Sequence, residues 1–71
     1  MKDQSRVKFG KHVARLRRQS MLTQEQLAAM AQLKPITVAN IEDGHFNVSF
    51  DIINRIAVVL GGELQIIIKE D

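Results

Sequence analysis

The chain has 71 residues, enough for one small domain that buries only about 60% of the surface exposed by its unfolded form. It contains no cysteine, and its two histidines, His12 and His45, lie far apart, which excludes disulfides and zinc clusters. Neither a membrane span nor a signal-peptide core is evident, so we expect a cytoplasmic protein with no membrane partner. Because a core of this size gives limited stability, the length favours a homo-oligomer.

Charge is distributed unevenly along the chain, although the net charge is only +2. Residues 1–20 contain seven basic residues and one acidic residue, whereas residues 21–71 contain three basic and seven acidic residues. A basic segment on a near-neutral protein favours a polyanionic partner, and a solvated helix face is the alternative. The sequence offers no cysteine nucleophile, glycine-rich phosphate loop or paired metal ligands, so we expect no enzyme, no catalytic residue, no metal and no cofactor.

Two helices are predicted in the first half of the chain. The first covers about residues 5–20, because apolar side chains recur there at spacings of four and three residues, at Phe9, Val13 and Leu16. The second is short, about eight residues, and begins after Thr23, whose hydroxyl can accept a hydrogen bond from the first turn. Gln26 three residues later completes a capping-box pattern.

Two further helices are predicted in the second half. Pro35 suits the first turn of a helix over residues 35–43, which Gly44 ends with a left-handed cap. Ser49 is a good cap for a fourth helix, which the two glycines at positions 61 and 62 end. The second and third helices, joined by a tight turn, form a helix-turn-helix unit.

The chain ends in a predicted β-strand over residues 63–69, whose centre is rich in isoleucine. Strand alternation places Leu64, Ile66 and Ile68 on one face and Ile67 on the other. A lone strand cannot pair its own backbone, so we expect it to pair with the same strand of a second subunit. The alternative is an apolar edge that packs on its own domain. If the strand pairs across a dimer, residues 1–62 form the helix-turn-helix domain and residues 63–71 its dimerisation strand.

Four motifs carry a resemblance to a known family, in residues 9–17, 22–28, 38–44 and 55–61. In this order and at these separations they resemble the Cro/CI-type (XRE) helix-turn-helix DNA-binding domain. The resemblance implies an all-α, lambda-repressor-like fold of four or five helices, here with a short C-terminal β-strand. That strand also resembles the strand of HipB-type antitoxins, which pairs across a two-fold axis.

The resemblance implies a set of DNA-binding residues. The start of the second helix matches the positions that grip phosphate, and residues 35–43 match the recognition helix, which lies in the major groove. Asn40 would pair with an adenine edge, and Ile36 or the Thr37 methyl would contact a thymine methyl. Lys34 would neutralise a phosphate. The implied DNA-binding set is Thr23, Gln24, Lys34, Ile36, Thr37 and Asn40.

The same comparison matches Arg17 and Glu42 to a structural ion pair that ties the first helix to the recognition helix. The family usually has glycine at the positions of Met21 and Gln32, so either strain or a different turn is expected there. At the start of the helix over residues 35–43, Lys34 and Pro35 replace the serine cap and the polar first residue that the family usually has. Two alternatives stay open: Ile36 is partly buried or at a subunit contact, and Phe46 packs in a dimer or backs the DNA.

We therefore expect a sequence-specific regulator, a repressor, that binds an inverted-repeat operator in double-stranded DNA as a homodimer. The alternative is an antitoxin of the HipB type, whose main role is to bind a protein toxin. The two functions are compatible, because HipB-type antitoxins perform both.

Overall fold

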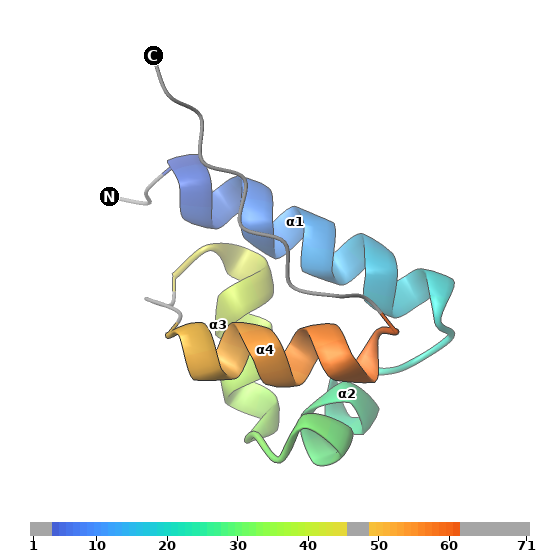
Figure 1. Cartoon of the computed structure of the whole chain (residues 1–71). Coiled ribbons are helices and arrows are strands. Elements are labelled where there is room, and N and C mark those ends of the chain that lie inside the picture. Colours follow the sequence, from blue (N-terminus) through green and yellow to red (C-terminus); the bar gives the residue numbers. More distant parts are fainter. Residues whose placement is uncertain (1–3, 46–48, 62–71) are drawn as a thin grey trace.

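The computed structural model describes residues 4–45 and 49–61, which form four helices (Figure 1). They are α1 (Gln4–Gln19), α2 (Gln24–Ala31), α3 (Pro35–Asp43) and α4 (Phe50–Val59). The four predicted helices are confirmed, and the described residues contain no strand. The predicted strand over residues 63–69 and Phe46 both lie outside the described residues.

Local capping explains where α2 and α4 begin. The Thr23 hydroxyl accepts from the Gln26 backbone N–H at 3.0 Å, and the Gln26 side chain accepts from the Thr23 N–H at 2.8 Å. Ser49 Oγ accepts from the Ile52 N–H at 3.3 Å at the start of α4. These bonds satisfy N–H groups that the first helical turn leaves unpaired, so each helix has a fixed start.

The two turns without the family's usual glycine keep the left-handed conformation. Met21 has φ 60° and Gln32 has φ 59°, a region that costs a residue with a Cβ roughly 1–2 kcal/mol. Backbone bonds at the second turn offset part of this cost, because the Leu33 N–H donates to the Ala28 carbonyl at 2.8 Å. The sequence left strain or a new turn geometry open, and the chain has the strained left-handed turn at both positions.

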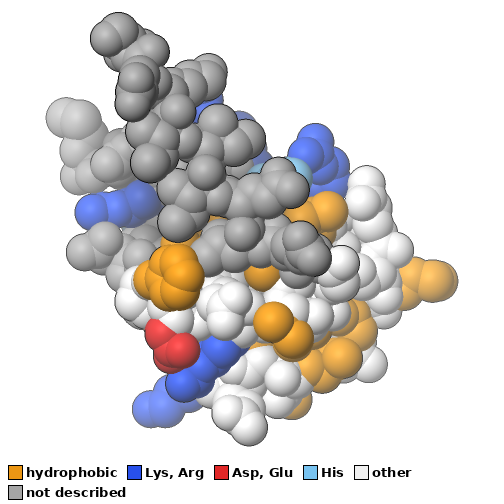
Figure 2. Space-filling model, in the orientation of Figure 1, with side chains coloured by type: hydrophobic (Ala, Val, Ile, Leu, Met, Phe, Trp, Pro, Cys, Tyr) orange, Lys and Arg blue, Asp and Glu red, His pale blue; other side chains and the backbone are white. Residues whose placement is uncertain are grey.

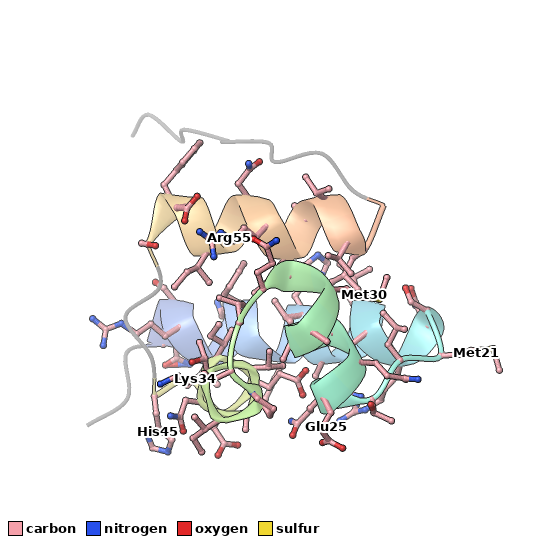
Figure 3. All side chains as sticks on the ribbon, turned by 90° about the horizontal axis from the view of Figure 1, so that it is seen from below. Met21, Glu25, Met30, Lys34, His45 and Arg55 are labelled. Atoms are coloured by element: carbon pink, nitrogen blue, oxygen red, sulfur yellow. The ribbon has the colours of Figure 1, made fainter. Side chains whose placement is uncertain are left out.

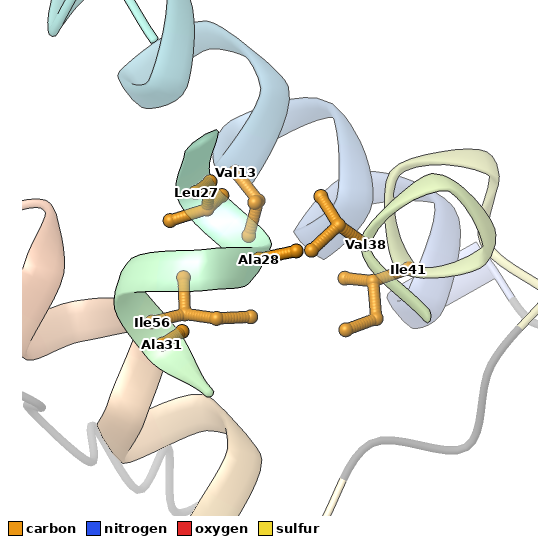
Figure 4. Packing of buried hydrophobic residues seen from close by; sticks show 7 residues of the cluster. All are labelled: Val13, Leu27, Ala28, Ala31, Val38, Ile41 and Ile56. Carbon is orange, nitrogen blue, oxygen red and sulfur yellow. The ribbon is translucent and has the colours of Figure 1, made fainter. Parts of the chain in front are cut away.

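All four helices contribute to one hydrophobic core (Figure 4). Its buried members are Val13, Leu27, Ala28, Ala31, Val38, Ile41 and Ile56. Helix α3 packs against both α1 and α2, and α2 also packs against α4, which crosses in front of α3 in Figure 1. Gly10 lets α1 approach α3 closely, since a Cβ there would lie 2.3 Å from the Ile41 carbonyl oxygen. The core therefore fixes the orientation of α3 against α1.

Several large apolar side chains stay at the surface. Met30, Phe50 and Val58 are 58%, 63% and 69% exposed, and Figure 2 shows hydrophobic side chains at several places on the face where α4 lies. None of the described helices is both long and apolar enough to cross a membrane.

Candidate nucleic-acid interface

Arg17 and Glu42 join three segments at the junction of α1, α2 and α3. Arg17 Nε donates to Glu42 Oε2 at 2.6 Å and Arg17 Nη2 donates to Glu42 Oε1 at 3.0 Å. Arg17 Nη1 also donates to the Leu22 carbonyl at 2.8 Å, and Gln24 Nε2 donates to Glu42 Oε1 at 3.0 Å. Helix α1, the entry to α2 and the end of α3 are therefore held by one hydrogen-bonded network.

Both members of the pair are nearly buried, with side chains 12% exposed for Arg17 and 7% for Glu42. Burial would raise the pKa of Glu42, but hydrogen bonds from Arg17 and Gln24 outweigh burial and hold its pKa below the usual value. The hydrogen bond to Glu42 raises the pKa of Arg17. Both groups are therefore charged near neutral pH, and the pair is the structural ion pair that the resemblance implied.

The α3 positions that the resemblance assigns to DNA reading are available at the surface. Ile36 is 62% exposed, Lys34 is exposed, and Thr37 and Asn40 are partly exposed. Ile36 and Asn40 are four residues apart, so they share one face of α3. Ile36 therefore lies outside the core of its own domain. Figure 3 shows Lys34 on the same side of the molecule as Glu25, in the first turn of α2, and His45, just after α3.

Thr23 and Gln24 occupy the start of α2, but they are held differently. The Thr23 hydroxyl is engaged in the capping box and the residue is exposed. The Gln24 side chain is partly buried and fixed by its bond to Glu42. The first turn of α2 also carries backbone N–H groups without an intrahelical acceptor, which suits an anion.

The sequence did not predict the bond between Gln24 and Glu42, because the two residues are 18 positions apart. It placed Lys11 and Arg18 only among four solvated basic residues of which one or two lie near the phosphates, and in the structure both line a surface hollow beside Gln24. Only the excess of basic residues in residues 1–20 pointed towards them. Within residues 4–45 and 49–61 no three histidine or acidic side chains are grouped to hold a metal ion.

Comparisons with known proteins agree with the helix-turn-helix arrangement of α2 and α3. The helix-turn-helix family model HTH_3 matches residues 13–67. The restriction-modification controller protein C.AhdI from Aeromonas hydrophila is 36% identical, with a TM-score of 0.84 over 86% of this chain and 92% of its own.

Two other solved structures share the fold. The clp gene regulator ClgR from C. glutamicum is 20% identical, with a TM-score of 0.83 over 90% of this chain and 82% of its own. A mutant of the restriction-modification controller protein C.Esp1396I is 22% identical, with a TM-score of 0.83 over 89% of this chain and 80% of its own. A search of curated proteins found no match. The family model covers most of the chain, and the chain belongs to the XRE-type helix-turn-helix family of DNA-binding regulators.

Proposed function

We propose that this protein is a sequence-specific repressor that binds an inverted-repeat operator as a homodimer. The observation that carries the proposal is the exposed face of α3, which presents Ile36 and Asn40 while Arg17 and Glu42 hold the helix against α1. A reading helix must be both accessible and fixed in orientation, because base edges in the major groove are recognised by direction-dependent contacts.

Each proposed DNA contact follows from the chemistry of its side chain. Asn40 pairs with an adenine edge, and Ile36 and the methyl of Thr37 contact thymine methyl groups. Lys34 neutralises a phosphate at the start of α3. Thr23 and Gln24 receive a second phosphate on the backbone N–H groups at the start of α2.

The proposed dimer places two copies of α3 in successive major grooves, ~34 Å apart, which requires an inverted repeat. Residues 63–71 supply the contact, with Leu64, Ile66, Ile67 and Ile68 as the apolar residues of the paired strands. The likeness to C.AhdI supports restriction-modification genes as the regulated targets.

An antitoxin is the second candidate function. The exposed apolar side chains of Met30, Phe50 and Val58 favour it, because large apolar surface groups are typical of protein-binding sites. These residues lie on α2 and α4. The proposed DNA contacts lie instead on α3, at the start of α3 and at the start of α2. A toxin complex should therefore survive a substitution on the exposed face of α3.

The test is fluorescence anisotropy with DNA from the protein's own promoter region and with a scrambled duplex, across a salt series. The wild type should prefer the operator by ~10³-fold or more. Asn40→Ala should weaken operator binding by roughly 5- to 150-fold, equivalent to about 1–3 kcal/mol, and leave binding to the scrambled duplex almost unchanged. Asn54→Ala, the same change at an exposed position of α4, is the control. Equal wild-type affinity for both duplexes would contradict the proposal.

A further inference from the structure

A second basic surface adjoins the proposed DNA interface. A hollow of about 510 Å³, here called the α1 hollow, opens where α1, the start of α2 and the end of α3 meet. Four cationic side chains line it, together with Gln24 and two carboxylates. The cations are Lys11, Arg15, Arg17 and Arg18, and the carboxylates are Glu42 and Asp43.

Charge pairing leaves the α1 hollow positive. Glu42 forms its ion pair with Arg17 and also attracts Arg18 at longer range, so its single negative charge offsets one of the four cations. Arg15 donates to His12 Nδ1 at 2.7 Å, which leaves its own charge uncompensated. Within residues 4–45 and 49–61, Lys11 and Arg18 form no ion pair. Three cations therefore remain against the single carboxylate of Asp43.

The position of the α1 hollow indicates its partner. Gln24 belongs both to this hollow and to the proposed phosphate contact at the start of α2. Asp43, at the end of α3, is three residues after Asn40 and seven after Ile36, so it lies on the same face of the helix. The α1 hollow therefore begins where the recognition surface ends.

The positive surface continues beyond the α1 hollow along the outside of α1. Lys11 and Arg15 also line a second hollow of about 310 Å³, together with Lys8 and His12. These four residues recur at spacings of three and four, which places them on one exposed face of the helix. A negatively charged partner could follow this face without a break.

We propose that the α1 hollow binds the phosphate backbone of DNA that flanks the bases read by α3, with Lys11 and Arg18 each neutralising one phosphate. This inference rests on the proposed function. DNA is the occupant because the α1 hollow is continuous with the surface that faces the operator. The carboxylate of Asp43 opposes this binding, so its removal should strengthen it.

The test compares the salt dependence of DNA binding for the wild type and the Lys11→Ala/Arg18→Ala double variant. The logarithm of affinity falls with the logarithm of salt concentration with a slope of about −0.9 for each phosphate neutralised. The double variant should reduce the steepness of this slope by about 1.8 and weaken binding to operator and scrambled DNA alike, roughly tenfold at low salt.

Two further variants sharpen this experiment. Lys8→Ala removes a cation one turn earlier on α1, outside the α1 hollow, and should change the slope by less than half as much as Lys11→Ala or Arg18→Ala alone. Asp43→Asn should tighten binding to both duplexes by several-fold. Far-ultraviolet circular dichroism and thermal unfolding establish that each variant is folded, since the substituted side chains are exposed.

A second arm varies the DNA. Trimming the base pairs outside the two half-sites should weaken wild-type binding and have little effect on the double variant. Specific operator binding with an unchanged salt slope in the double variant would overturn this inference and leave the proposed function intact. Loss of operator preference in the wild type would instead overturn the proposed function.

Discussion

The two helices that we propose to face the DNA begin in opposite ways. Helix α2 starts with a complete capping box, and its first residue, Gln24, is hydrogen-bonded to Glu42 at the end of α3. Helix α3 starts at Lys34 without a side-chain cap, and Pro35 occupies its first turn. The side chains at the start of α2 thus stabilise the fold, whereas the Lys34 side chain at the start of α3 makes no capping bond.

This difference separates residues that hold the unit from residues that read DNA. Substitutions around Glu42 and Thr23 should lower the free energy of unfolding, because their side chains make bonds within the protein. Substitutions at the exposed positions of α3 should change DNA affinity alone. The predictions below test this separation, from the largest expected effect to the smallest.

Glu42→Ala should have the largest effect on stability. It leaves the nearly buried Arg17 without its partner, and breaking such a pair costs about 3–5 kcal/mol. Urea unfolding measures the loss. Asp51→Ala is the matched control, because it breaks the pair with Arg55, whose side chain is 41% exposed while that of Asp51 is 68% exposed, and should cost about 0.5 kcal/mol or less. Equal losses in the two variants would contradict this ranking.

Acid should weaken the same network. The pKa of Glu42 is lower in the folded protein than its ordinary value of 4.5, so the unfolded chain binds a proton more readily. The stabilisation by the ionised Glu42 carboxylate is therefore fully present above pH 4.5. It is lost as the pH falls through the lower pKa that Glu42 has in the folded protein. Urea unfolding between pH 7 and pH 3 should show this decline. In Glu42→Gln the decline should be smaller, and an identical decline would show that other carboxyl groups cause it.

Thr23→Ala and Lys34→Ala compare the two helix starts directly. Removing the cap at Thr23 should lower the free energy of unfolding by about 1 kcal/mol. Removing the Lys34 side chain should change it by less than about 0.5 kcal/mol, because the side chain makes no capping bond. Thermal unfolding measures the stability of both variants, and a DNA titration measures their affinity for DNA. A stability loss at Lys34 as large as that at Thr23 would break the comparison.

Met21→Gly should have a small effect of the opposite sign. Met21 is 89% exposed with φ 60°, so glycine relieves strain and removes few contacts. We expect a gain of about 0.5 kcal/mol in the free energy of unfolding. A loss in the thermal unfolding experiment would mean that the methionine side chain stabilises the turn.

Local signals in the sequence predicted much of the fold. Thr23, Pro35, Gly44 and Ser49 act on the nearest turn of the backbone, and the helix bounds they predict agree with the structure to within a residue or two. The first helix was predicted over about residues 5–20 and covers Gln4–Gln19. Caps and left-handed turns depend on neighbouring residues, which is why sequence alone reveals them.

Features that depend on tertiary packing were less accessible. The Arg17–Glu42 pair came from the family resemblance rather than from spacing, and the bond from Gln24 to Glu42 was not predicted. The excess of basic residues in residues 1–20 gave no indication that Lys11 and Arg18 line one hollow with Gln24 at the start of α2. Such contacts join residues distant in sequence, so they follow from how α1 packs on α3.

The central claim is that α3 reads DNA in the major groove, and methylation protection of guanine N7 tests it most directly. With the operator saturated by the wild-type protein, we predict two protected blocks related by inversion, with centres about 10 base pairs apart. Asn40→Ala should need a higher protein concentration to give the same two blocks, because its contact is to adenine and α3 still occupies the groove once the DNA is saturated. DNA that is bound, as judged by anisotropy, but unprotected at every guanine N7 would contradict the account.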